Sequence, residues 1–351
     1  MSPHGLTTED LATIALDLVG WSELPLDSAI YVPGQGIRRV LVGIDIGTAE
    51  LLLARQLGCD AVVAHHPVGM RHRMAPVYRR HVELMMAHGI PREAAEAAIR
   101  ERIEELETAG HADNYDHVVS VARLLNIPFL NLHAPCDEAG RRILQGIINE
   151  TLARNPRVSL REIAEALGQL SEFQEAETSI RIALGEPDAP AGKVAMVHGA
   201  LTNGGYAVAR TYFDHGIDTV VYIHIAPGEL ARLRREGRGQ LLITGHIASD
   251  SVGINPWIAE LEARGVEVIR ISGILGRFDP ANRRFLNRRA TASSCPTKGE
   301  RSPHAAFGRP PPSQPRWRNV AGARKSPAIH LLSAGGRRGC AGGAHSGSPG
   351  C

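Results

Sequence analysis

Two short apolar runs, separated by one helix-length segment, constrain the fold more than any other feature of this sequence. The runs RVLVGIDI (residues 39–46) and CDAVVAHHP (59–67) have the length of strands and are rich in β-branched residues. Between them, AELLLARQLG predicts a helix that ends at Gly58. Strand, helix and strand in about 30 residues predict a βαβ unit, whose two strands lie parallel in one sheet.

A second unit of the same kind follows. KVAMVHGA and IDTVVYIHIAP are predicted strands on either side of the glycine-entered helix GGYAVARTYFDHG, and QLLITGH is the next strand. We expect Asn255 to cap a helix that has Pro256 at its first position, and VEVIRISGI to close this second sheet. Residues 58–66 align with residues 216–224. The fold class is therefore α/β, with two βαβ-containing lobes and mainly parallel sheets flanking one cleft.

The pattern divides the chain into three parts. Residues 1–140 form the first α/β lobe, with a helical insert at about 77–120, and residues 141–285 form a helical connection and the second α/β lobe. Residues 286–351 are predicted to be a disordered tail, because glycine and proline near 30% without a period leave too little apolar surface to bury. Nine Lys and Arg but one acidic residue follow position 290, so the tail is basic. It either contacts RNA or an acidic partner, or has no selected role.

Composition excludes several classes of protein. Aromatic residues make up only 4% of the chain, and its body is mildly acidic, so we expect no nucleic-acid partner for the folded part. No apolar run reaches the roughly 18 to 20 residues of a membrane span, and the first residues lack the pattern of a signal peptide. The five cysteines do not form a disulfide framework. We expect a soluble, cytoplasmic protein without a membrane partner.

Histidines and carboxylates gather where three predicted strands end. His65 and His66 precede a proline, His133 is followed by Asp137, and His246 is followed by Asp250. Ligands bind at the carboxyl ends of parallel strands, and imidazole with carboxylate is the composition of a nitrogen/oxygen metal site. Taken singly, each histidine could instead be a hydrogen-bonded structural residue. The combination of the three segments favours a metal site.

The same three segments carry a family resemblance. IDIGTAELLLARQLGCDAVVAHHP, LHAPCDEAGRRILQGIINE and GHIASDSVGI, in this order, resemble the Nif-three-like family of dinuclear-metal proteins, also known as GTP cyclohydrolase 1 type 2 homologues. The resemblance implies that the metal ligands are His65, His66, Asp137, His246 and Asp250. Asp250 stands where the family usually has glutamate. His133 corresponds to a histidine beside the family's site, whereas His198 and His224 are expected to be structural or to support the ligands.

The resulting hypothesis is a metal-dependent hydrolase with two divalent ions flanked by the two lobes. Zinc, iron, manganese, cobalt and nickel all suit such ligands. Asp137 would bridge the ions, and a bridging hydroxide would attack a small-molecule substrate, with nucleotides among the candidates. The resemblance also implies a homohexamer, with the 77–120 insert as an extra interface. The alternatives are a non-catalytic metal-binding scaffold and a regulator that binds nucleic acid. His111 and Asp113 are expected to have a capping or surface role.

Overall fold

The structure is a computed structural model that describes residues 5–69 and 71–286, all within one compact unit of the chain. The tail was predicted for residues 286–351, and from residue 287 onward it lies outside the described residues. In the part that is described, no helix is both long enough and apolar enough to cross a bilayer.

The first sheet contains both strands of the first βαβ unit. Its order is β1-β4-β3-β2-β9, with β1 antiparallel to β4 and the other neighbours parallel. The strands are β1 (Ala29–Val32), β2 (Arg39–Gly43), β3 (Ala61–Ala64), β4 (Phe129–Asn131) and β9 (Glu267–Ile271). The predicted parallel pairing is confirmed, because Gly43 of β2 lies opposite Ala64 of β3.

The second sheet repeats this arrangement with fewer strands. Its order is β5-β8-β7-β6, with β5 antiparallel to β8 and the others parallel. The strands are β5 (Arg181–Leu184), β6 (Val194–Met196), β7 (Thr219–Tyr222) and β8 (Gln240–Ile243). The α/β class with two mainly parallel sheets is therefore confirmed.

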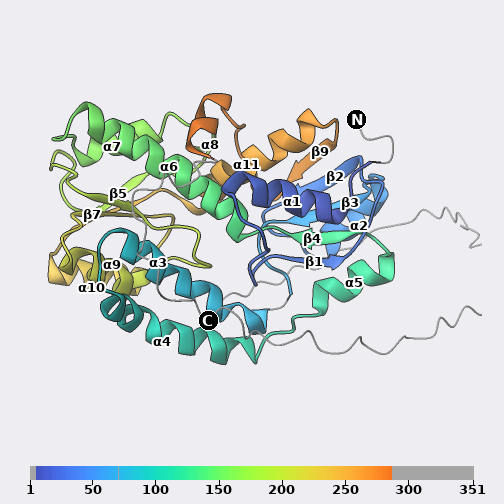
Figure 1. The fold of residues 1–351 in the computed structure, drawn as a ribbon, viewed down its shortest axis with the longest axis horizontal. Helices are drawn as coiled ribbons and strands as arrows, with labels where there is room; N and C mark the ends of the chain where they lie inside the picture. Colours follow the sequence, from blue (N-terminus) through green and yellow to red (C-terminus); the bar gives the residue numbers. More distant parts are fainter. Residues whose placement is uncertain (1–4, 70, 287–351) are drawn as a thin grey trace, which may run out of the picture. The chain divides into compact units, whose positions relative to one another are not determined.

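Helices cover both sheets and also lie between them (Figure 1). The α-helices are α1 (Thr8–Val19), α2 (Thr48–Gln56), α3 (Arg80–Ala87), α4 (Arg92–Gly110), α5 (His117–Leu125), α6 (Ala134–Arg154), α7 (Leu160–Leu167), α8 (Ser171–Gln174), α9 (Gly205–Asp214), α10 (Pro227–Glu236) and α11 (His246–Ala263). Short 3-10 turns are η1 (Arg71–Arg73), η2 (Ala75–Arg79) and η3 (Pro280–Phe285). Several helices begin where the sequence predicts. Thr7, for example, caps α1 by accepting a hydrogen bond from the amide of Asp10.

The core of the described residues lies on both faces of each sheet. The central part joins α1, α6 and α11 to the first sheet through Val42 and to the second sheet through Leu242. On the outer face of the first sheet, α2 and α5 cover Val62. On the outer face of the second sheet, α3, α4 and α9 cover Val220. The helical insert is therefore part of the folded core, with Ile99 of α4 buried against the second lobe.

Two predictions about the end of the second lobe are wrong. Strand β9 does not close the second sheet but pairs in parallel with β2 of the first. No helix begins at Asn255, because α11 is one continuous helix with Pro256 inside it. The amide of Asn255 is instead buried, donating to Glu172 at 2.7 Å and to the carbonyl of Leu275 at 2.8 Å.

The physical reason for both errors is the burial of α11. From residue 248 to residue 258 every side of this helix is buried, since it lies between the two sheets. Packing on all sides compensates for the backbone hydrogen bond that Pro256 cannot make. The chain then emerges beside the first sheet.

The division of the chain at residues 140 and 285 stays a prediction.

Candidate metal centre

The histidines and carboxylates of the three motifs meet at the carboxyl ends of the parallel strands. His65 and His66 directly follow β3, and Asp137 lies in the first turn of α6, just after β4. His246 and Asp250 lie in the first two turns of α11, after β8. Parallel strands bring such segments to one edge, and α11 carries its two residues from the second lobe to the first.

Three of these side chains form a deeply buried group. His65 Nε2 lies 3.1 Å from Asp137 Oδ1 and 3.8 Å from Asp250 Oδ2, and all three side chains are at most 5% exposed. Two ligands about 2.1 Å from one ion lie about 3.4 Å apart in tetrahedral geometry. The observed separations therefore fit ligands of a single ion.

A second group of three shares one member with the first. Asp250 Oδ2 lies 3.2 Å from His246 Nε2 and 3.5 Å from His66 Nε2. The two groups could each hold an ion, and Asp250 is common to both. Among the described residues a third possible group joins His65, His66 and His133. The shared carboxylate is therefore Asp250, in the position for which the sequence hypothesis named Asp137.

Hydrogen bonds on the far side of the rings fix how three imidazoles face the cluster. Nδ1 of His65 lies 3.0 Å from the carbonyl oxygen of Leu132. Nδ1 of His66 lies 2.7 Å from a carboxylate oxygen of Asp45. Because these oxygens only accept, each Nδ1 carries a proton, and a neutral ring then turns the lone pair of Nε2 to the cluster. This is the usual arrangement of metal-binding histidines.

His133 is held in the same way, at the entry to α6. Its Nδ1 donates to Asp27 at 2.7 Å, and its backbone amide donates to Ser28 Oγ at 2.9 Å. Its Nε2 lies 3.6 Å from Asp137 Oδ2. His133 thus lies beside the carboxylate, as the sequence motif suggests, and Asp27 orients it.

Buried polar atoms without hydrogen-bond partners test whether the cluster fits a metal. Among the described residues, seven buried side-chain atoms lack a partner, and four of them are His65 Nε2, Asp137 Oδ1, His198 Nε2 and Asp250 Oδ2. An unpaired buried polar atom costs about 1–3 kcal/mol, more if charged. His65, Asp137 and Asp250 form one of the groups that could hold an ion, and a bound cation would satisfy their three unpartnered atoms.

The electrostatics keep both carboxylates ionised. Burial alone would raise the pKa of Asp137, but the imidazoles of His133 and His198 outweigh burial and hold that pKa well below its usual range. Burial also opposes ionisation of Asp250, yet the facing imidazoles of His66, His65 and His246 lower its pKa. The charges of Asp137 and Asp27, against the effect of burial, raise the pKa of His133 to about 9. The cluster therefore presents two anionic carboxylates.

A pocket of about 510 Å³ opens beside the cluster, with one wall from the second lobe. His198 follows β6 and His224 follows β7, and both line it, as does Asn203. Burial lowers the pKa of His224, and the neighbouring imidazole of His246 adds to that effect. The opposite wall comes from the segment between α4 and α5, including Asp113. The expected surface role of Asp113 is therefore incomplete, because it lines this pocket.

A close approach of two helices sets the position of the carboxylates. Gly140 of α6 faces Gly253 of α11, three residues beyond Asp137 and Asp250 respectively. A Cβ atom added to Gly253 would lie 2.1 Å from the carbonyl oxygen of Cys136. Only glycine permits this contact, so backbone packing fixes how near the two carboxylates lie.

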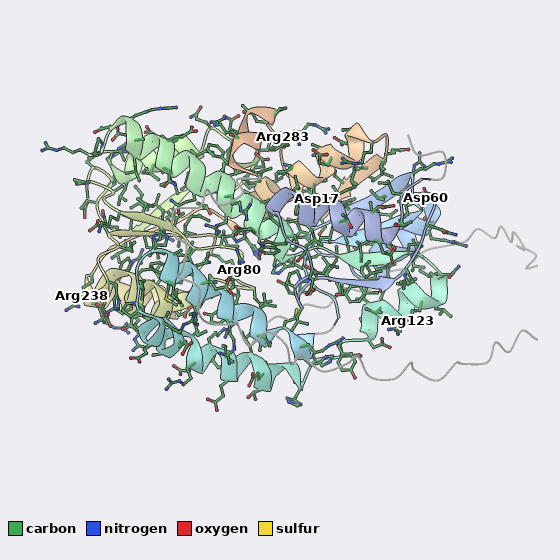
Figure 2. The ribbon with its side chains drawn as sticks, viewed as in Figure 1. Asp17, Asp60, Arg80, Arg123, Arg238 and Arg283 are labelled. Atoms are coloured by element: carbon green, nitrogen blue, oxygen red, sulfur yellow. The ribbon has the colours of Figure 1, made fainter. Side chains whose placement is uncertain are left out.

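A buried ion-pair network supports the same turn of α6. Glu138 accepts hydrogen bonds from Arg141, Arg142 and Arg80 (labelled in Figure 2) at 2.6–2.8 Å. Burial alone would raise the pKa of Glu138, but Arg141 and Arg80 lower it to about 2. The network anchors the residue next to Asp137.

The structure thus brings together the five side chains that the motifs singled out, and His133 with them. It also shows three residues that sequence reasoning missed: Asp27, Asp45 and Asn203. Asp45 had a detectable signal, since it lies just after the strand that pairs with the strand preceding His66. The other two lie in loops and carry no pattern of their own.

Proteins similar to this chain are found among solved structures, whereas no family model and no curated protein matches it. A NIF3 superfamily protein from Sphaerobacter thermophilus is 53% identical, covering 77% of this chain and 99% of its own, with a TM-score of 0.75. Reduced HcgD from Methanocaldococcus jannaschii is 13% identical, covering 76% and 98%, with a TM-score of 0.48. The Staphylococcus aureus hypothetical protein SA1388 is 12% identical, covering 78% and 99%, with a TM-score of 0.45.

Proposed function

Because the chain belongs to the NIF3 superfamily, we propose that its buried histidine–carboxylate cluster binds two divalent metal ions and that the protein is a metal-dependent hydrolase. The observation that carries the metal proposal is the convergence of three unpartnered buried atoms, on His65, Asp137 and Asp250. Zinc, iron, manganese, cobalt and nickel all suit such a mixture of ligands.

The proposed ligands divide between the two groups. His65 and Asp137 would hold one ion, His66 and His246 would hold the other, and Asp250, which belongs to both groups, would contribute to both. Only three protein donors then face each ion, so positions remain for water or substrate. This assignment gives Asp250 the bridging role and keeps all five ligands that the sequence predicts.

Bound divalent ions would supply Lewis acidity and an activated water at neutral pH. The residues of the chain do the rest. Asp45 and the carbonyl of Leu132 hold the Nδ1 protons of His66 and His65, so that Nε2 of each faces the cluster. His133 and His198 lie 3.6 Å from the two oxygens of Asp137 and maintain its negative charge. The pocket admits a small molecule beside the cluster.

The decisive experiment measures metal and turnover on the same preparations. Protein purified without added metal should contain about two divalent ions per chain by elemental analysis. His65→Ala should lose metal, whereas the exposed control His215→Ala should retain it. Hydrolysis of phosphoester, amide and nucleotide panels should depend on metal and be lost with His65. Stoichiometric metal without turnover would refute the hydrolase and leave a metal-binding protein; absence of metal would refute both.

We also propose the homohexamer that the family resemblance implies. Sedimentation of the full chain at micromolar concentration tests it directly. A stable monomer would refute this assembly without affecting the metal proposal.

A further inference from the structure

His224, beside the cluster, differs from the other histidines there in which ring nitrogen donates and which accepts a hydrogen bond. In His65, His66 and His133, Nδ1 lies 2.7–3.0 Å from an oxygen that can only accept. In His224, Nδ1 lies 2.9 Å from the side-chain nitrogen of Asn203. That nitrogen can only donate, so Nδ1 of His224 is the acceptor.

The orientation of the Asn203 amide is fixed by a third group. Its Oδ1 accepts a hydrogen bond from the backbone amide of Gly205 at 3.0 Å. If the amide were turned over, its nitrogen would face the Gly205 N–H, and two donors would oppose each other. The observed orientation therefore stands, and the neutral ring of His224 carries its proton on Nε2.

His224 lies where such a donor can reach a bound molecule. Its ring lines the pocket, and its centroid lies 4.7 Å from that of His246. Among the described residues, no hydrogen-bond partner of His224 Nε2 is found, whereas Nδ1 is occupied. We propose that His224 is a substrate-binding residue whose Nε2–H donates a hydrogen bond to an oxyanion of the substrate, with Asn203 as the positioning residue that fixes this tautomer.

The rest of the pocket narrows the class of substrate. Of the described side chains that line the pocket, none is lysine or arginine, and the polar ones include Thr202, Asn114 and Tyr115. A long polyphosphate chain would find neither lysine nor arginine there, although charge-assisted bonds to these side chains are usual for phosphates. The pocket suits a small molecule with a single oxyanion group, such as a phosphomonoester or a carboxylate.

The tautomer can be measured without metal or substrate. In the full chain labelled with ¹⁵N-histidine and studied metal-free at pH 8, His81 should show a neutral ring with the proton on Nε2, because that atom lies 2.9 Å from the carbonyl oxygen of Thr202. A further ring of this kind, that of His224, should disappear in His224→Gln. In Asn203→Ala the same ring should become a mixture of tautomers. A proton on Nδ1 of His224, or a mixture in the wild type, would overturn the proposal.

The donor role is tested with inorganic phosphate as the probe, by calorimetry on protein loaded with metal. His224→Gln can accept from Asn203 through Oε1 and still offer an N–H, so its phosphate affinity should stay within about threefold of wild type. His224→Leu should bind phosphate about 10- to 100-fold more weakly, the range for a hydrogen bond to a charged group. Equal affinity in the leucine variant, or no binding by the wild type, would overturn the oxyanion contact.

This inference rests on the proposed metal centre for the place of the substrate, but its failure is distinguishable. Metal content is measured on the wild type and on every variant. A wild-type protein that binds no metal would refute the metal centre while leaving the tautomer result intact.

Discussion

Strands β3 and β7 begin in the same way in the two lobes, but the histidines that follow them have different hydrogen-bond partners. Gly58 and Gly216 each have positive φ at the end of a helix, and an aspartate follows two residues later. Asp60 (Figure 2) accepts hydrogen bonds from the backbone at the start of β2, and Asp218 accepts one at the start of β6. Strands β3 and β7 follow. At the aligned positions after them lie His66 and His224.

The difference between these two histidines lies in a neighbouring side chain. Asp45, after β2, accepts the Nδ1 proton of His66. Asn203, after β6, donates to Nδ1 of His224. A carboxylate therefore prepares one imidazole to bind a cation, while an amide prepares the other to donate a hydrogen bond. The chemical role of a strand-end histidine is decided by its partner, and four predictions test how far the contrast between the lobes extends.

The largest effect is expected at Asp250, where the segments from the two lobes meet. Asp250→Ala should lose both ions, because its carboxylate belongs to both groups of ligands. Asp137→Ala should lose one, since Asp137 belongs to a single group with His65. Elemental analysis of both variants after reconstitution with zinc provides the measurement, with His215→Ala as the control. Retention of one ion in Asp250→Ala and of none in Asp137→Ala would restore the bridging role to Asp137.

The next effect concerns the contact that joins the two carboxylate-bearing helices. Gly253→Ala should lower the free energy of unfolding by about 1–3 kcal/mol, because the new Cβ would lie 2.1 Å from a backbone oxygen. Gly228→Ala is the matched control: it also lies in a helix, and a Cβ there would contact nothing within 4 Å. Urea denaturation of metal-free protein measures both. Equal stability of the two variants would show that α6 and α11 can separate at little cost.

A smaller effect is expected when Asp45 of the first lobe is replaced by asparagine, the residue type that contacts His224 in the second lobe. Asp45→Asn should weaken zinc affinity about tenfold, the lower end of the range for residues that orient ligands. The effect is limited because the amide can still accept through its oxygen. Competition with a chelator measures the affinity, and Asp17→Asn, an exposed carboxylate on α1, is the control. An unchanged affinity would mean that Asp45 does not prepare His66.

The smallest difference is expected between the two aspartates that anchor the strands. Asp60→Ala should lower the free energy of unfolding by about 1 kcal/mol and Asp218→Ala by about half as much, given roughly 0.5–1.5 kcal/mol for each hydrogen bond. Asp60 accepts from two amides, of Arg38 and Arg39, whereas Asp218 accepts from that of Lys193. Urea denaturation with Asp17→Ala as control would detect the difference. The reverse order would show that the number of hydrogen bonds that each aspartate accepts does not set its contribution to stability.

The sequence predicted the local elements and the five side chains of the cluster well, for a physical reason. Buried parallel strands are short apolar runs, and the residues just after them share one edge of the sheet, so the amino-acid pattern alone places His65 and Asp137 together. The sheet that β9 joins could not be predicted in this way, because its pairing depends on where the fully buried α11 emerges.

The hydrogen-bond partners of the imidazoles could not be predicted from the sequence either. Asp27 and Asn203 lie in loops, and their roles depend on contacts with residues 106 and 21 positions away. Loop conformation is set by tertiary packing, so a single polar residue in a loop carries little signal of its own. The convergence of the imidazoles and carboxylates could thus be inferred from pattern, whereas the tautomers depend on contacts that only the folded chain makes.

The return of the chain to its first sheet has a consequence for how the protein is made. Arg39, at the start of β2, and Glu267, at the start of β9, are 228 positions apart, and the whole second lobe is synthesised between them. At about 5–20 residues per second, a ribosome needs roughly 10 to 45 s to cover that distance. During this time β2 has an open edge, which is a template for unwanted pairing. The nascent first lobe thus displays His65 and His66 long before Asp250 exists, so the complete cluster can form only after the second lobe has been synthesised.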